Sequence, residues 1–183
     1  MQYGLLVAAC WLVFVVYWGI SATGAKRTLN NAYGNFLWWR LGAVMLIIIF
    51  VHFSGLHIDF MYRPTELLGW LGVVITAIGI AFAIWARVYL ASNWGMPMSV
   101  KENPELVTSG PYAYVRHPIY TGVLLGMLGS AFVMGPAWTI VLFIGGAYFT
   151  YSAFQEEKLM LKEFPNVYPA YKTRTKMLIP FIL

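Results

Sequence analysis

Charged residues and cysteines are both scarce in this sequence. Only 10% of the 183 residues are charged, against roughly 25% in an average soluble domain, which excludes a soluble globule of this size. The only cysteine, Cys10, excludes a disulfide framework and a cysteine-rich zinc site. A hydrophobic content of 60% excludes a disordered chain. These absences leave an integral membrane protein.

Five apolar runs approach the roughly 20 residues that a membrane helix needs. The first carries no charge and exceeds the usual 7–15 residues of a signal-peptide core, so we expect it to be retained. Only Met134 to Pro136 separates the last two, which predicts a tight helical hairpin. The sequence therefore predicts an all-α, integral membrane helical bundle of about five transmembrane helices, with a cytosolic C-terminal helical tail. The predicted spans are Tyr3 to Ala22, Phe36 to Gly55, Leu67 to Leu90, Pro118 to Met134 and Pro136 to Phe154.

The basic residues predict the orientation of these spans. The chain has 12 Lys and Arg against 7 Asp and Glu, and five spans place all of the basic residues except Arg63 on one side. Basic loops face the cytosol, so we expect the N-terminus outside and the tail in the cytosol. The loop from Ala91 to His117 shares that cytosolic face. In so apolar a chain the basic excess marks helix ends, and no nucleic-acid partner is expected.

The first polar motif lies from Leu106 to Gly122, "LVTSGPYAYVRHPIYTG". Pro118 can open a helix there, because a first-turn proline loses no needed donor. His117 would then lie at the mouth of that helix, beside Arg116 and Tyr120. The free N–H groups of a helix start suit an anionic ligand group. The alternative is a polar helix cap at the membrane surface.

The second polar motif follows the fifth apolar run. Glu156 and Glu157 come directly after that run, and ionisable groups at a membrane boundary often mark function. The alternative is that they only terminate the span. Tyr168, Tyr171 and Arg174 recur at intervals of three, which predicts one helical face, or else an interfacial anchor of aromatic and basic side chains.

Other features do not indicate a site. Gly122, Gly126 and Gly129 have the spacing of close helix packing. The sequence contains no strand, glycine-rich loop and helix in succession, which excludes a Rossmann site. His52 and His57 alone make a weak case for metal binding, and we therefore predict no metal site.

The two polar motifs together resemble the isoprenylcysteine carboxyl methyltransferase family of membrane enzymes, with phospholipid N-methyltransferases as more distant relatives. The matching stretches are "ELVTSGPYAYVRHPIYTG" and "EEKLMLKEFPNVYPAYKTRTKMLIP", and the passage "WARVYLASNW" also matches. The resemblance covers residues 67–183. It predicts a single membrane-embedded domain over 1–183, in which 1–66 form an N-terminal helical hairpin and 67–183 form the catalytic core.

The resemblance implies S-adenosylmethionine as methyl donor, bound from the cytosol, and a lipophilic acceptor that enters from the bilayer. Glu156 would take the substrate-side carboxylate position, and either Glu156 or Glu157 could receive a proton from an amine acceptor. The implied cofactor-binding residues are Lys101, Glu105, Leu106, Val107, Tyr112, Arg116, His117, Pro118, Ile119 and Tyr120.

The sequence departs from the family pattern at three places. Ser152 stands where many members carry an Arg one helical turn before the first Glu, Pro165 replaces a Gly, and Thr175-Lys176 replaces Val-Pro. An Arg is the natural bidentate partner of a substrate carboxylate, so the first departure leaves the methyl acceptor open. Arg174 is the candidate to replace that Arg.

Three candidate functions are compatible with the sequence. The first is a methyltransferase that acts on a lipophilic acceptor, with a prenylcysteine-type carboxylate as one acceptor and a phospholipid or another small-molecule amine as the alternative. The second is a membrane sterol-type reductase that uses NADPH. The third is a non-catalytic scaffold or transporter subunit, against which the nearly charge-free span interiors argue. We expect the first, with membrane lipids as surroundings.

Overall fold

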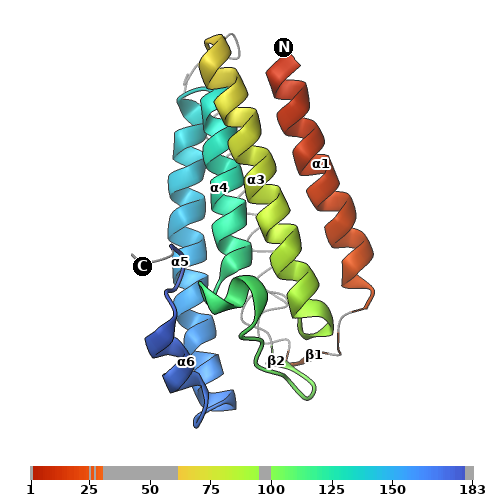
Figure 1. Cartoon of the computed structure of the whole chain (residues 1–183), viewed down its shortest axis with the longest axis vertical. Coiled ribbons are helices and arrows are strands. Elements are labelled where there is room, and N and C mark those ends of the chain that lie inside the picture. Colours follow the sequence, from red (N-terminus) through yellow and green to blue (C-terminus); the bar gives the residue numbers. More distant parts are fainter. Residues whose placement is uncertain (1, 25, 27, 31–61, 95–99, 180–183) are drawn as a thin grey trace.

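A computed structural model describes residues 2–24, 26, 28–30, 62–94 and 100–179. Long helices run side by side along the long axis of the molecule, and a short helix lies beside the lower part of the last one (Figure 1). The helices are α1 (Gln2–Ala22), α3 (Glu66–Leu90), α4 (Pro118–Met134), α5 (Ala137–Glu163) and the short α6 (Tyr168–Arg174).

The helices confirm the predicted all-α membrane bundle. Three stretches, namely α1, α3 with its following turn, and α5, are long and apolar enough to cross a membrane, while α4 is a shorter apolar helix. These four helices coincide with four of the predicted spans. The remaining span, Phe36 to Gly55, lies outside the described residues, as do His52 and His57. The orientation of the bundle stays a prediction.

Helices α3 and α4 touch backbone to backbone. A methyl group built on Gly79 would lie 2.5 Å from the amide nitrogen of Gly126 and 2.6 Å from the carbonyl oxygen of Gly122. One built on Gly129 would lie 2.5 Å from the carbonyl oxygen of Gly72. Small residues let membrane helices approach this closely, which confirms the packing role predicted for the glycines of α4.

Helix α5 continues beyond its apolar part. The predicted span stops at Phe154, whereas the helix runs to Glu163. Gln155 and the charged residues that follow it are compatible with a helix. Phe164 is the C-cap of α5, and the next residue, Pro165, cannot continue a helix. The charged end of α5 therefore projects past the apolar bundle and carries the second motif.

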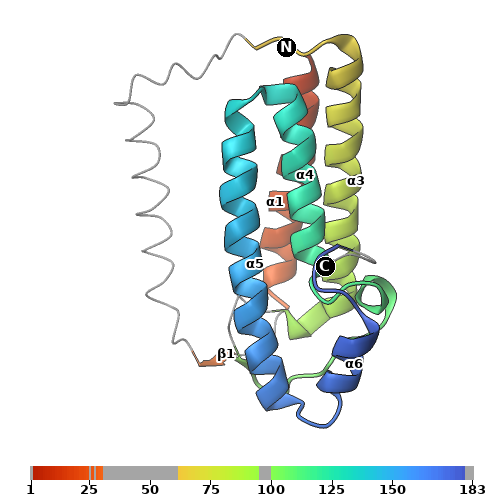
Figure 2. The same cartoon turned by 90° about the vertical axis from the view of Figure 1, so that its left-hand side faces the viewer.

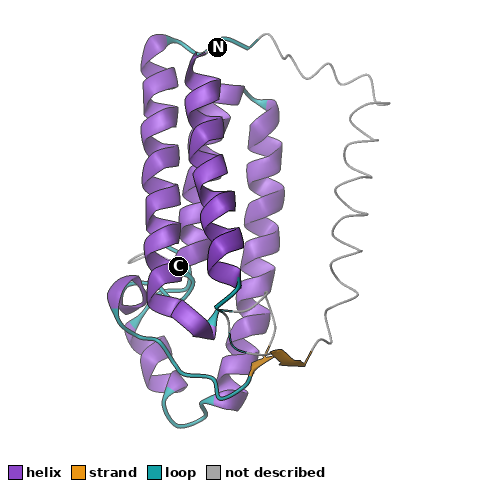
Figure 3. Cartoon of the chain, turned by 90° about the vertical axis from the view of Figure 1, so that its right-hand side faces the viewer, coloured by secondary structure: helices purple, strands orange, loops and turns teal. Residues whose placement is uncertain are grey.

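The polar segments gather at one end of the bundle. Helix α3 leads directly into a 3₁₀ helix, Ala91–Asn93, and the first polar motif contains a second 3₁₀ helix, Gly110–Ala113. Two short strands that the sequence did not predict, β1 (Thr28–Asn30) and β2 (Val100–Lys101), pair antiparallel there. Figures 2 and 3 show the strands, both polar motifs and α6 at the same end of the molecule.

A buried arginine fixes the end of α3. Arg87 is 3% exposed, and its guanidinium donates hydrogen bonds of 2.5 Å to the carbonyl oxygens of Ser21 and Ala91. It also lies 4.9 Å from the centre of the Trp94 ring. Ala91 has φ 47°, in the left-handed region, and the bond to its carbonyl stabilises this bend. Arg87 thus joins α1 to α3 and directs the chain toward the cavity described below.

Candidate active site

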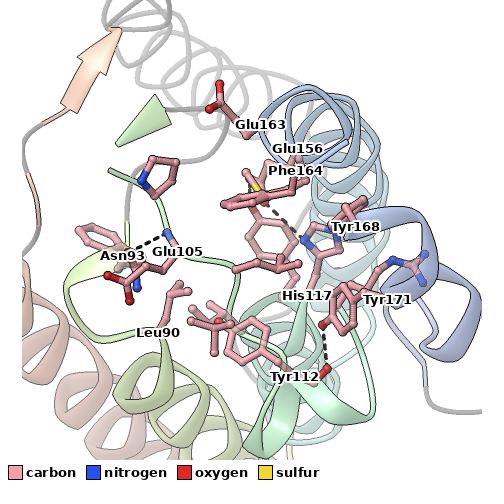
Figure 4. Close-up of a pocket in the computed structure, with 18 of the residues that line it drawn as sticks. Leu90, Asn93, Glu105, Tyr112, His117, Glu156, Glu163, Phe164, Tyr168 and Tyr171 are labelled. Atoms are coloured by element: carbon pink, nitrogen blue, oxygen red, sulfur yellow. Dashed lines mark hydrogen bonds and ion pairs between the residues drawn. The ribbon is translucent and has the colours of Figure 1, made fainter. Parts of the chain in front are cut away.

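A cavity of about 380 Å³ opens at the polar end of the bundle. Its walls come from α1, the end of α3, the loop at Pro104 to Val107, the start of α4, the charged end of α5, and α6. Figure 4 shows side chains from these elements pointing toward one another across the cavity. The two polar motifs, which lie about 40 residues apart in the sequence, therefore form one pocket.

Most of the predicted site residues line this cavity. The first polar motif and the loop before it contribute polar and apolar side chains, and α5 contributes one carboxylate. These lining residues are Glu105, Leu106, Val107, Tyr112, Arg116, His117, Ile119, Tyr120 and Glu156.

Three predicted site residues are placed elsewhere. Pro118 is buried at the first position of α4 and only opens the helix. Glu157 is buried behind the cavity wall, and Arg174 is exposed at a second hollow on the outer side of α6. Lys101 belongs to β2, and its side chain lies outside the described residues. Arg174, the candidate to replace the arginine that precedes Glu156 in many relatives, therefore does not line the cavity that Glu156 lines.

His117 stands where the two motifs meet. Its Nδ1 lies 3.4 Å from the Glu156 carboxylate, and its ring stacks on Tyr120 with 5.5 Å between ring centres. Its Nε2 lies 3.8 Å from the Glu157 carboxylate. Burial lowers the pKa of His117, but the hydrogen bonds and charges of Glu156 and Glu157 outweigh it, so the pKa is raised above its usual value. The site therefore favours a cationic imidazole.

Glu156 is held by a second donor. The Tyr120 hydroxyl donates a short hydrogen bond to it, and the Tyr120 ring packs 4.8 Å from that of Phe149. Two donors, an imidazole and a phenol, thus fix the orientation of one carboxylate on the cavity wall. A carboxylate fixed in this way can stabilise a cation or accept a proton without first reorganising.

Glu157 links the site to the tail. Its carboxylate lies 2.6 Å from Arg116 Nε and 2.6 Å from Lys172 Nζ. Arg116 also donates to the carbonyl oxygens of Lys172 and Thr175. Its backbone N–H and that of His117 bond to the tail carbonyls of Lys176 and Met177. Through its ion pairs with Arg116 and Lys172, Glu157 therefore holds the tail against the first motif.

Two tyrosines of α6 close the cavity. Tyr168 and Tyr171 are buried, and the Tyr171 hydroxyl donates a 2.7 Å hydrogen bond to the carbonyl oxygen of Tyr112. Burial raises the pKa of Tyr171 to about 12 and raises that of Tyr112 as well, so both phenols stay neutral at physiological pH. The predicted shared face is thus correct for the two tyrosines, while Arg174 points outward.

The loop that carries Glu105 is tied to the segments that follow α1 and α3. Lys26 Nζ lies 3.0 Å from the Glu105 carboxylate and 2.8 Å from the side-chain oxygen of Asn93. The Glu105 amide donates to the same Asn93 oxygen at 3.3 Å. The hydrogen bond from Lys26 lowers the pKa of Glu105. Lys26 and Asn93 thus hold this loop over the cavity.

Several cavity residues were not among the site residues that the sequence predicted. Phe14 and Trp18 on α1 stack with 4.5 Å between ring centres, and Trp18 meets Trp94 edge to face at 6.0 Å. The chain contains 17% aromatic residues, so no single one stands out. Other cavity residues lie inside the matching stretches or beside them but were not predicted individually: Leu90, Asn93, Pro104, Val123, Phe149, Met160, Glu163 and Phe164.

Ser152 stands one turn before Glu156, where many relatives carry an arginine. It is fully buried, and its hydroxyl has no hydrogen-bond partner within the part of the chain that the structure describes. Ser152 is not among the residues that line the cavity. The pocket wall beside Glu156 is formed instead by Phe149 and Met160 of the same helix.

Comparison with known proteins agrees with the two motifs. The model of the phospholipid methyltransferase family matches residues 67–167. A cobalt-zinc-cadmium resistance protein, CzcN of Cupriavidus metallidurans, is 31% identical over 83% of this chain and 69% of its own length. The protein-S-isoprenylcysteine O-methyltransferase of Schizosaccharomyces pombe is 28% identical over 74% of this chain and 58% of its own length.

A solved structure shares the fold. The eukaryotic intramembrane Ras methyltransferase, isoprenylcysteine carboxyl methyltransferase, superposes with a TM-score of 0.57 at 21% identity, over 84% of this chain and 55% of that one. The chain thus spans little more than half the length of that enzyme and of the yeast relative. The family model, the relatives and the fold agree with the resemblance read from the two motifs, and the chain belongs to the phospholipid methyltransferase family of membrane proteins.

Proposed function

We propose that this protein transfers a methyl group from S-adenosylmethionine to a lipophilic acceptor within the cavity at the polar end of the bundle. The observation that carries the proposal is the meeting of His117 and Glu156, 3.4 Å apart, on one wall of a cavity of about 380 Å³. That volume lies within the roughly 300–1,000 Å³ typical of small-molecule sites.

The residues of the cavity fit such a donor. When bound, S-adenosylmethionine supplies an electrophilic methyl group on a sulfonium cation. The Glu156 carboxylate and the ring faces of Tyr112 and Tyr120 can stabilise a cation of this kind. Trp18 and Trp94 offer flat apolar surfaces for a planar base.

The chain's own residues would orient the reactants. Transfer to a nucleophile requires the reacting atoms to lie about 3–3.5 Å apart and in line. His117 and Tyr120 fix Glu156, and Glu157 with Arg116 fixes the backbone that carries His117. For an acceptor that carries a proton, Glu156 is placed to receive it.

The acceptor that we propose is a lipophilic molecule that reaches the cavity from the bilayer. Apolar residues of α1, α4 and α5 line its membrane side, including Phe14, Val123 and Phe149. Relatives bear the names of an isoprenylcysteine O-methyltransferase and a methanethiol S-methyltransferase. A prenylcysteine-type carboxylate is therefore the first acceptor to test, against a long-chain thiol and a long-chain amine.

The test begins with donor binding to the purified full-length chain in detergent, measured by calorimetry. We expect saturable binding of S-adenosylmethionine, weakened on the order of tenfold by His117→Ala and by Tyr120→Phe. Tyr114→Phe is the matched control, because Tyr114 is exposed and does not line the cavity. Equal affinity of all three variants would contradict the proposed site. Binding of NADPH in place of S-adenosylmethionine would support the reductase alternative.

The second stage incubates the protein with methyl-labelled donor and each of the three acceptors. We expect label in at least one lipophilic product and none after Glu156→Gln. Glu102→Gln, an exposed carboxylate outside the cavity, is the control. Labelling that persists in Glu156→Gln would remove Glu156 from the chemistry while leaving the transferase activity in place.

A further inference from the structure

A second hollow, of about 360 Å³, lies on the outer side of α6, behind the wall of the main cavity. Four basic side chains line it, together with one carboxylate among its described lining residues, Glu157. The basic residues are Arg116, Lys172, Arg174 and Lys176. Arg174 and Lys176 have no part in the transfer proposed above.

The hollow lies where the apolar part of α5 ends. Phe154 lines it and is 51% exposed, and Tyr151, one turn earlier, is 55% exposed. Charged residues begin at Glu156, just beyond this point. Aromatic side chains next to basic ones mark the depth of the lipid headgroups in membrane proteins. The hollow therefore opens at the bilayer surface, with an apolar side toward the lipid chains.

The charges of the hollow are only partly balanced. Glu157 lies 2.6 Å from both Arg116 and Lys172, so its single negative charge is shared by these two. Arg174 and Lys176 are exposed and form no ion pair with the described residues. The Arg174 Nε–H instead donates to the carbonyl oxygen of Ala170 at 3.2 Å. The hollow thus retains an excess of positive charge that suits a phosphate.

We propose that this hollow binds the phosphate group of an anionic phospholipid. Arg174 and Lys176 contact the phosphate, Lys172 adds its charge from the rim, and the lipid chains lie along Phe154. Basic pockets beside membrane helices are suited to anionic headgroups of this kind. Because Arg116 lines both hollows, the bound lipid would sit one side chain away from the His117 and Glu156 pair. The proposal stands independently of the reaction assigned to the main cavity.

The test measures binding of short-chain lipids to the full chain in a zwitterionic detergent. The probes are dioctanoyl phosphatidylglycerol, dioctanoyl phosphatidylcholine and inorganic phosphate, and the readout is the shift of the thermal unfolding midpoint with probe concentration. We expect saturable stabilisation by phosphatidylglycerol alone. The variant Arg174→Gln with Lys176→Gln should weaken its apparent affinity on the order of 30-fold, from two lost basic contacts.

The matched control removes the same charge from another exposed place. Lys158 and Lys162 lie on α5 outside the hollow, and Lys158→Gln with Lys162→Gln should change the affinity less than threefold. An equal loss in both double variants would show only diffuse attraction and overturn the proposal. Equal stabilisation by phosphatidylcholine would overturn it as well. If inorganic phosphate stabilised the protein at the same concentrations as the lipid, the ligand of the hollow would be a soluble anion and the lipid proposal would be wrong.

Discussion

The apolar half and the polar end of this molecule are held together by different means. In the apolar half, α3 and α4 meet through glycine backbone, and the few polar groups form uncharged hydrogen bonds inside the bundle, as Thr76 does to the carbonyl oxygen of Gly72 at 2.8 Å and Trp11 does to the Ser130 hydroxyl at 2.9 Å. At the polar end, Arg116 and Glu157 form a buried ion pair that the exposed Lys172 joins, and the three residues connect segments distant in sequence.

This difference follows from the surroundings of each half. Lipid is as apolar as the side chains, so membrane helices gain little from hydrophobic burial and associate through close packing and internal hydrogen bonds. Charged groups lie at the polar end, where ion pairs specify which segments meet. The helices of the apolar half are therefore held together by close packing, whereas the segments at the polar end are held together by ion pairs.

The largest effect should come from breaking the network at the polar end. Arg116→Met leaves the buried Glu157 with Lys172 and the more distant His117, and it frees two carbonyl oxygens. Loss of one partner of a buried ion pair costs about 3–5 kcal/mol. Unfolding in detergent by a chemical denaturant should show this loss, whereas Lys158→Met, at an exposed position, should have little effect. A stable Arg116→Met variant would mean that charge does not hold the tail.

A smaller effect should follow from His117→Gln, and it should depend on pH. The pKa of His117 is raised in the folded protein, so the imidazolium contributes its full stability below the unfolded value of about 6.5 and loses it as the pH rises through the raised value. Hydrogen bonds to charged groups contribute roughly 1.5–3 kcal/mol. The gap between wild type and variant should narrow from acidic to basic pH. A gap that is constant over the range would contradict a cationic His117.

The apolar half can be tested with a single methyl group. Gly79→Ala would place a Cβ atom 2.5 Å from the backbone of Gly126, and overpacking of this kind costs about 1–3 kcal/mol. Gly146→Ala is the matched control on α5, because nothing lies within 4 Å of its Cβ position. Thermal unfolding midpoints in the same detergent should fall for the first variant only. Equal midpoints would show that α3 and α4 have room to separate.

The smallest effect should come from the exposed pair at the edge of the cavity. Lys26 and Glu105 lie 3.0 Å apart, with the Glu105 side chain 74% exposed. Salt screens exposed pairs, so Glu105→Gln should leave the unfolding midpoint nearly unchanged at about 0.15 M salt. A drop appearing only at low salt would be consistent with a screened pair, and a large drop at both salt concentrations would contradict it.

The sequence predicted the helices better than the connections. An uncharged apolar run identifies a membrane helix by composition alone, so α1, α3 and α4 agree with their predicted ranges within one residue. The helical tail predicted after the fifth span begins as the charged end of α5, which runs on to Glu163 because its charged residues extend beyond the apolar run without breaking the helix. The pairing of β1 with β2 rests on so few residues that no periodicity could indicate it.

The sequence predicted the site only in part, because a motif shows which residue types are present but not which side of the cavity each one occupies. Proximity of His117 and Glu156 was expected, and the structure places them 3.4 Å apart. Adjacent positions on a helix point in different directions, so Glu156 faces the cavity while Glu157 faces the tail. Trp18 reaches the cavity from a helix without any motif, and only the three-dimensional packing of α1 on α3 brings it there.

The close approach of α3 and α4 also bears on the proposed reaction centre. His117 directly precedes the first turn of α4, and the glycine backbone of α4 contacts that of α3. A shift of α4 that displaced His117 toward α3 would therefore press backbone against backbone. In methyl transfer a misplacement of about 1 Å can cost on the order of 100-fold in rate, so the interface between α3 and α4 would also protect the alignment of the proposed reactants.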